Sequence, residues 1–146
     1  MENNEYILKE INLSNQDDEA LEEAIHMNLG NENKAGICYI KIKGNEGPIP
    51  HFHIESKSGK FFCCVKLYEA DYFHHIDGEK DLSKDQKEIL NENLSVDDWK
   101  NLCTAFNNLN VNDKSKKEMF DNYIKGLKKK KADVYYFEKP DYRLIP

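Results

Sequence analysis

Apolar and polar residues alternate with a period of two in the middle of the chain. Successive side chains of a strand point to opposite faces, so this alternation predicts strands over residues 36–43, 51–56 and 60–69. The turn-forming run 44–50 and the dipeptide Ser58-Gly59 separate these strands. Connections this short favour an antiparallel meander.

On both sides of the meander, apolar residues recur at intervals of three and four, which is typical of helices. Ser83 and Ser95 each begin a sequence that resembles a capping box, which marks a helix start. A short strand is expected over residues 5–13. The predicted helices cover residues 16–29, 83–94, 96–109 and 115–129.

These elements predict an α+β fold, in which a small antiparallel sheet of three to four strands packs against three to four helices. A chain of 146 residues is long enough for one domain with a sizeable core and short for two. We see no internal repeat and no long linker, so we expect a single domain over residues 1–146. Its expected regions are an acidic strand and helix at 1–32, a β-meander at 36–69, a helical half at 83–130 and an irregular tail at 132–146.

The net charge of −6 is distributed unevenly. Residues 1–32 contain nine acids and one lysine, a balance of −8, whereas residues 113–131 contain eight lysines and three acids, a balance of +5. The overall acidity argues against a general nucleic-acid binder. No apolar run approaches the roughly 18 residues of a membrane span. The acidic N-terminus also lacks the pattern of a signal peptide, so we expect a cytoplasmic protein without membrane contact.

The stretch with the most chemical potential is the strand that contains His51 and His53. In a strand, these two histidines share one face with Glu55, while Phe52 and Ile54 occupy the other face. A transition-metal site such as a zinc site needs three or four nitrogen, sulfur or carboxylate ligands. The residues that could complete such a site are His74, His75, Glu69, Asp71 and Asp77.

Three interpretations of this strand stay open: a metal site, a metal-free contact with a ligand or partner, and a structural role. The spacing matches no standard metal signature. A metal site formed by His51, His53, His74 and His75 requires residues 68–77 to fold back over the strand.

Other catalytic arrangements find less support in the sequence. The acids and histidines of residues 69–75 could supply a general base, but the same run also suits a loop anchored by its aromatic residues. Cys63 and Cys64 lie in an apolar run, which is a poor setting for a reactive thiolate, and we expect reduced, buried thiols. Residues 77–81 match a calcium-binding loop poorly.

Three short motifs occur in order between residues 41 and 109. They are residues 47–53 (GPIPHFH), 64–67 (CVKL) and the helix start at 82–84 (LSK). In this order they resemble a group of small bacterial proteins of uncharacterised function that carry a Pro-(x)-His-x-His strand and are found in mobile-element, phage and toxin–antitoxin-like loci. The resemblance covers about half of the chain, and it implies a genomic context without a reaction.

We therefore expect a small protein-binding or regulatory protein of a mobile element or of a defence or anti-defence locus, which acts by protein–protein contact; an enzyme is the less favoured class. The acidic residues expected to meet a basic partner surface are Asp17, Asp18, Glu19, Glu22 and Glu23. The residues His51, His53 and Glu55 form a second candidate contact. Nucleic acid is expected to be contacted only through Lys128, Lys129, Lys130 and Lys131, if at all.

Two alternatives come from other functional classes. The first is a metal-assisted hydrolase or nuclease that uses His51 and His53 with an ion such as zinc. The second is a sensor of a small anionic ligand, such as a nucleotide, contacted by the same histidines. In each case, self-association as a homodimer stays open.

Overall fold

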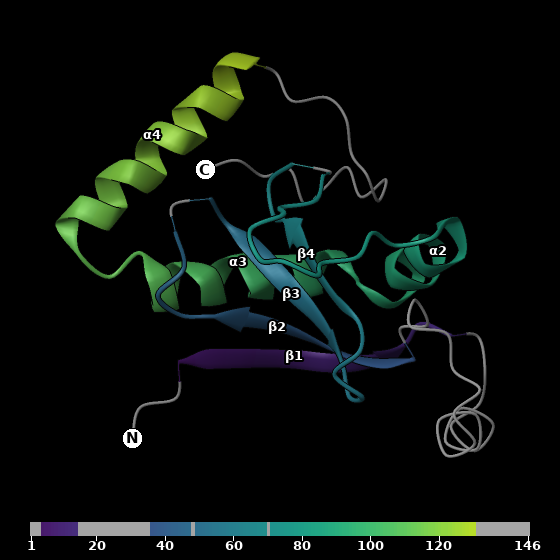
Figure 1. Ribbon diagram of the computed structural model, residues 1–146. Coiled ribbons are helices and arrows are strands. Elements are labelled where there is room, and N and C mark those ends of the chain that lie inside the picture. Colours follow the sequence, from purple (N-terminus) through teal and green to yellow (C-terminus); the bar gives the residue numbers. More distant parts are fainter. Residues whose placement is uncertain (1–3, 15–35, 48, 70, 131–146) are drawn as a thin grey trace.

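The computed structural model describes residues 4–14, 36–47, 49–69 and 71–130 (Figure 1). The helix predicted over residues 16–29, the acidic partner-contact residues within it and the tail at 132–146 lie outside the described residues. No helix in the described ranges is both long enough and apolar enough to cross a membrane.

Four antiparallel strands form one sheet, with the strands in sequence order. The strands are β1 (Glu5–Asn12), β2 (Ile37–Lys43), β3 (His51–Ser56) and β4 (Phe62–Lys66). Together with the helices, this sheet confirms the predicted α+β fold and its meander. The last strand is shorter than the predicted 60–69, because the chain turns away from the sheet after Lys66.

Three helices follow the sheet: α2 (Lys84–Asn93), α3 (Val96–Asn110) and α4 (Lys114–Lys130). Both capping boxes are present, with Ser83 and Ser95 each accepting a hydrogen bond from the backbone of the third helical residue. In this way two of the backbone N–H groups that a helix start leaves unpaired are satisfied at each box. Figure 1 shows α3 behind the sheet and α4 projecting away from it.

One face of the sheet forms the hydrophobic core with α3. Ile40, Phe52 and Ile54 of the two central strands are fully buried there. The Phe52 ring meets the indole of Trp99 on α3 edge-on, with 5.1 Å between ring centroids. Phe52 and Ile54 thus point to the core, as the alternation predicted, and His51 and His53 point to the opposite face.

The opposite face is covered over only part of its area. At β1 to β3 it carries a set of charges in which Glu55 pairs with Lys41 and Lys43. Near β4 it is covered by residues 71–80, which we call the fold-back segment. The Phe73 N–H donates to the Cys64 carbonyl at 3.0 Å, and the Lys80 N–H donates to the Phe62 carbonyl at 2.8 Å. These bonds pair the segment with the free edge of β4, and the rings of Phe73 and His75 lie 4.6 Å and 4.8 Å from the ring of His51. The segment therefore reaches the histidines of β3, which is the condition that the metal-site prediction required.

Candidate metal centre

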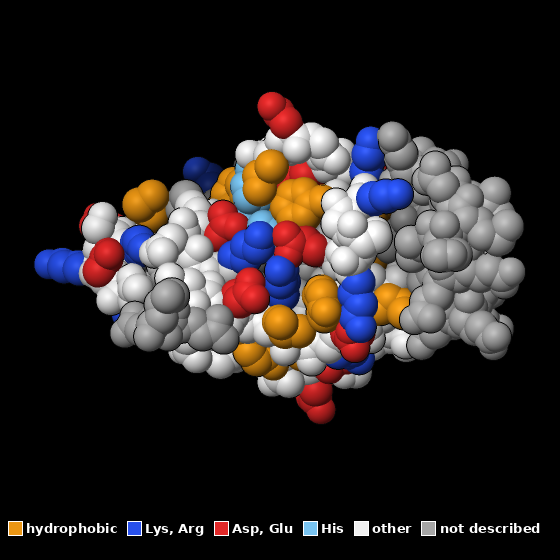
Figure 2. Space-filling model, turned by 60° about the horizontal axis from the view of Figure 1, so that its bottom comes forward, with side chains coloured by type: hydrophobic (Ala, Val, Ile, Leu, Met, Phe, Trp, Pro, Cys, Tyr) orange, Lys and Arg blue, Asp and Glu red, His pale blue; other side chains and the backbone are white. Residues whose placement is uncertain are grey.

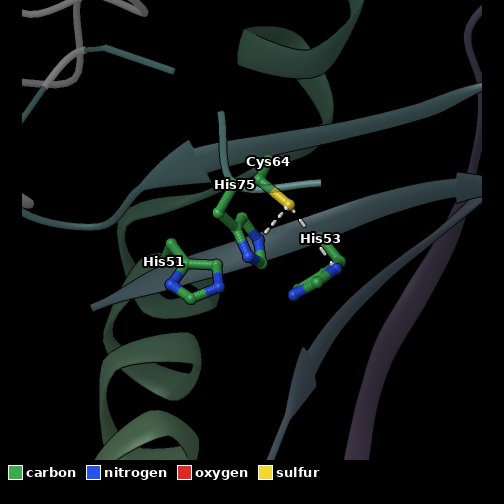
Figure 3. Close-up of side chains that lie close together, drawn as sticks. All are labelled: His51, His53, Cys64 and His75. Atoms are coloured by element: carbon green, nitrogen blue, oxygen red, sulfur yellow. Dashed lines mark hydrogen bonds between the residues drawn. The ribbon is translucent and has the colours of Figure 1, made fainter. Parts of the chain in front are cut away.

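Four side chains from three parts of the fold converge on one point beneath the fold-back segment (Figure 3). They are His51 and His53 on β3, Cys64 on β4 and His75 on the fold-back segment, and one donor atom from each lies within 4.8 Å of every other. The register of the sheet brings the first three together, because His53 and Cys64 are direct cross-strand partners. His51 joins them because it lies two residues before His53 on the same face.

The distances from the Cys64 thiol to two of the other donor atoms are close to those in a tetrahedral zinc site. The Cys64 Sγ lies 3.5 Å from His53 Nδ1 and 3.2 Å from His75 Nε2. A tetrahedral zinc ion with ordinary Zn–S and Zn–N bond lengths holds a sulfur and a nitrogen about 3.6 Å apart. The longest donor separation, up to 4.8 Å, exceeds the corresponding nitrogen–nitrogen spacing of about 3.4 Å by about 1.4 Å. Binding would therefore draw the most widely separated donors together by up to about 1.4 Å.

The outer nitrogens of two histidines are already held. The Nδ1–H of His51 donates to the Ile49 carbonyl at 2.7 Å, and the Nε2–H of His53 donates to the Glu46 carboxylate at 2.7 Å. A metal-binding histidine characteristically donates its second ring N–H to a carbonyl or carboxylate, which fixes the tautomer. The remaining nitrogens, Nε2 of His51 and Nδ1 of His53, therefore carry lone pairs.

The Nε2 atom of His51 is buried, and no residue in the described part of the chain offers it a hydrogen bond. A buried polar atom without a partner costs free energy, so native structures seldom contain one without a reason. A metal ion bound to the cluster would supply that partner.

Burial sets the protonation of the cluster. It lowers the pKa of both His51 and His53 to about 4, although the hydrogen bonds to Ile49 and Glu46 act in the other direction. Both rings are therefore neutral at pH 7, which is the form that binds a metal. Burial, reinforced by the nearby Glu79 carboxylate, raises the pKa of the Cys64 thiol, so the metal-free protein holds it protonated and poorly nucleophilic.

Contacts within the fold-back segment position His75. Its backbone N–H donates to Glu79 Oε2 at 2.8 Å, and its ring stacks on Phe73 with 4.6 Å between centroids. The side chain of His75 is 19% exposed, whereas that of Glu79 is only 2% exposed. The other three members of the cluster are fully buried.

The structure brings together three of the four histidines predicted to bind a metal. His74 is not part of the cluster: its side chain is 56% exposed and its Nε2 lies 2.8 Å from Asp81 Oδ1. Neighbouring residues of an extended segment point in opposite directions, so only one of the two adjacent histidines can face the sheet. Cys64 takes the fourth place, which the sequence analysis had assigned to His74.

The other predicted site residues have different surroundings. Glu55 shares the face of His51 and His53 but pairs with two lysines, and Glu69 pairs with Lys66 at 2.9 Å. Lys128 and Lys129 are exposed near the end of α4, while the side chain of Lys130 and all of Lys131 lie outside the described residues.

Two residues that the sequence analysis missed, Glu46 and Glu79, contact the cluster from outside. Neither has a motif that would have marked it. Cys64 could have been found by aligning the hairpin about its Ser58-Gly59 turn, since that alignment places it opposite His53.

Two grooves border residues that contact the cluster, although none of the four donor residues lines either groove. A groove of about 300 Å³ between α3 and the start of α4 is lined by both apolar and polar residues and has Glu46 on its wall. A second groove of about 620 Å³ lies over the charged face of the sheet and includes Phe62 and Ile76. Figure 2 shows histidine side chains reaching the surface there, between hydrophobic side chains and alternating lysines and acids.

Comparisons with protein-family models, with curated proteins and with solved structures found no match. The resemblance to small proteins of bacterial mobile elements stays a prediction. Any argument about function therefore starts from the cluster itself.

Proposed function

We propose that this protein binds one transition-metal ion through His51, His53, Cys64 and His75. The observation that carries the proposal is the buried Nε2 of His51, which has no hydrogen-bond partner in the described chain and lies in a set of four donors within 4.8 Å. One thiolate and three imidazoles form a mixed sulfur and nitrogen set, which suits zinc and its neighbours better than magnesium or calcium.

The closed arrangement favours a structural or regulatory centre over a hydrolytic one. Structural zinc sites use four protein ligands, whereas catalytic sites keep one position open for water. Three of the four side chains here are fully buried, which leaves little room for a substrate. An ion in this position would cross-link β3, β4 and the fold-back segment. The hydrolase or nuclease alternative would require that one of the four side chains does not coordinate the ion.

The proposal is tested on the full chain, purified without a histidine tag. Elemental analysis is expected to find one transition-metal ion per chain, and zinc added to chelator-treated protein is expected to raise the melting temperature. The stabilisation should reach about 4 kcal/mol when free zinc is about 1,000 times Kd. Cobalt substitution adds a specific signal, since a thiolate ligand gives a charge-transfer band.

Variants at matched positions distinguish the cluster from its surroundings. Cys64→Ser should abolish the cobalt–thiolate band, and His75→Ala should reduce the metal content. The control is His74→Ala, which removes the adjacent exposed histidine and should leave both unchanged. A wild-type chain that contains no metal after purification and shows no heat of zinc binding in calorimetry would overturn the proposal.

A further inference from the structure

We propose that two carboxylates outside the donor set, those of Glu46 and Glu79, make this centre selective for a divalent ion over cuprous copper. The inference rests on the proposed metal-binding function and concerns which ion the site accepts. The donors alone do not decide this, because thiolate and imidazole bind both zinc and cuprous ions well.

Glu79 lies beside the His75 and Cys64 side of the cluster. Its Oε2 accepts the backbone N–H of His75 at 2.8 Å, which fixes the orientation of the carboxylate. Its Oε1 is buried and lies 3.8 Å from His75 Nε2, and the carboxylate is close enough to the Cys64 thiol to help raise the pKa of that thiol. A carboxylate with one oxygen satisfied and the other directed at a donor set is arranged to interact with positive charge.

Glu46 contacts the cluster through the two histidines of β3. Its Oε1 lies 2.7 Å from His53 Nε2 and 3.7 Å from His51 Nε2. Asn110 holds its backbone in place, because the Asn110 Oδ1 accepts the Glu46 N–H at 2.7 Å. Both flanking carboxylates are thus held in position without an ion.

No lysine or arginine within the described ranges forms an ion pair with either carboxylate. Lys43, three residues before Glu46, pairs with Glu55 at 3.0 Å. The histidines that face the two carboxylates are uncharged when they bind a metal. The Glu79 side chain is only 2% exposed, and a buried carboxylate without a compensating charge is costly, so a bound cation would remove that cost.

The charge balance then favours the more highly charged ion. The Cys64 thiolate and the two carboxylates contribute three negative charges, and the imidazoles contribute none. A divalent ion leaves a net charge of −1, whereas a cuprous ion leaves −2. Because Coulomb attraction scales with the charge of the ion, each carboxylate stabilises the divalent ion about twice as strongly as the cuprous ion.

The experiment measures zinc and cuprous affinities of the full chain by competition with a chromophoric chelator for each ion. Glu79→Gln keeps the shape and the acceptor for the His75 N–H but removes the charge. It is expected to weaken zinc binding about tenfold and cuprous binding only about threefold, because the carboxylate interacts with the cuprous ion half as strongly. Glu46→Gln should shift the ratio in the same direction. The matched control is Glu69→Gln, which neutralises a carboxylate already paired with Lys66 and should leave the ratio unchanged.

The outcomes separate this inference from the proposed function. If the wild-type chain binds neither ion, the proposed function fails. If it binds metal but both glutamine variants weaken zinc and cuprous ions equally, or change neither, the selectivity inference is overturned and metal binding stands. Circular dichroism of each variant establishes that it is folded, and the two independent substitutions keep the test decisive if one of them does not fold.

Discussion

The metal-free protein should lose stability steeply on mild acidification, because His51 and His53 are buried in their neutral forms. Both have a pKa of about 4 in the folded chain, against an ordinary value near 6.5. Below pH 6.5 the unfolded chain takes up protons at these rings while the folded chain does not. The free energy of unfolding is therefore at its full value above pH 6.5, and it decreases as the pH is lowered towards 4.

The size of the effect follows from the two pKa values. Between pH 7.5 and pH 5.0, each histidine should remove about 2 kcal/mol of stability, so the pair removes about 4 kcal/mol. The total stability of a domain of this size is about 5–15 kcal/mol, so the loss is large. Carboxylates contribute mainly below this pH range, since Glu55 and Asp98 have pKa values held below their usual range by Lys41 and Lys43 and by Lys9.

Urea unfolding in the presence of a chelator measures this loss. The fluorescence of Trp99, the chain's one tryptophan, reports the transition because the indole is buried against Phe52. His51→Phe suits the neighbouring rings of Phe73 and Phe106 and should reduce the pH dependence by about half. His74→Phe removes a histidine whose side chain is 56% exposed and should change the pH dependence much less than His51→Phe does. Equal unfolding free energies at pH 7.5 and 5.0, or the wild-type slope in His51→Phe, would refute the reasoning.

Two further substitutions test opposite ends of α3. Asn110→Ala removes the hydrogen bonds to the Glu46 N–H and the Lys43 carbonyl. It should lower the free energy of unfolding, measured with urea, by about 2–3 kcal/mol. It should also weaken zinc binding in calorimetry, because the backbone of Glu46 is no longer held in place. Unchanged zinc affinity in this variant would contradict the role given to Glu46. Ser95→Ala removes the N-terminal capping box and should cost about 1 kcal/mol with zinc affinity unchanged. If Ser95→Ala also lost zinc binding, any destabilisation of α3 would be sufficient to weaken the metal centre, and the effect of Asn110→Ala would not be specific to Glu46.

Local patterns in the sequence were sufficient for the elements of the described fold. The strand of His51 and His53 follows from alternation, since Phe52 and Ile54 give the other face a core to pack against. The starts of α2 and α3 follow from their capping boxes, because capping involves residues only three positions apart. The strand predicted over 60–69 was too long, because hydrophobicity alone does not mark where the chain leaves the sheet.

The composition of the candidate centre depended on contacts between distant parts of the chain. Cys64 enters through the register of β3 and β4, and His75, not His74, enters because the fold-back segment presents one of two adjacent histidines to the sheet. Glu46 and Glu79 reach the cluster from a loop and from the far end of that segment. The sequence by itself determined that two histidines share a strand face. Only the tertiary structure decided which residues complete the set, because a metal site is defined by distances between side chains and local sequence patterns specify only neighbours.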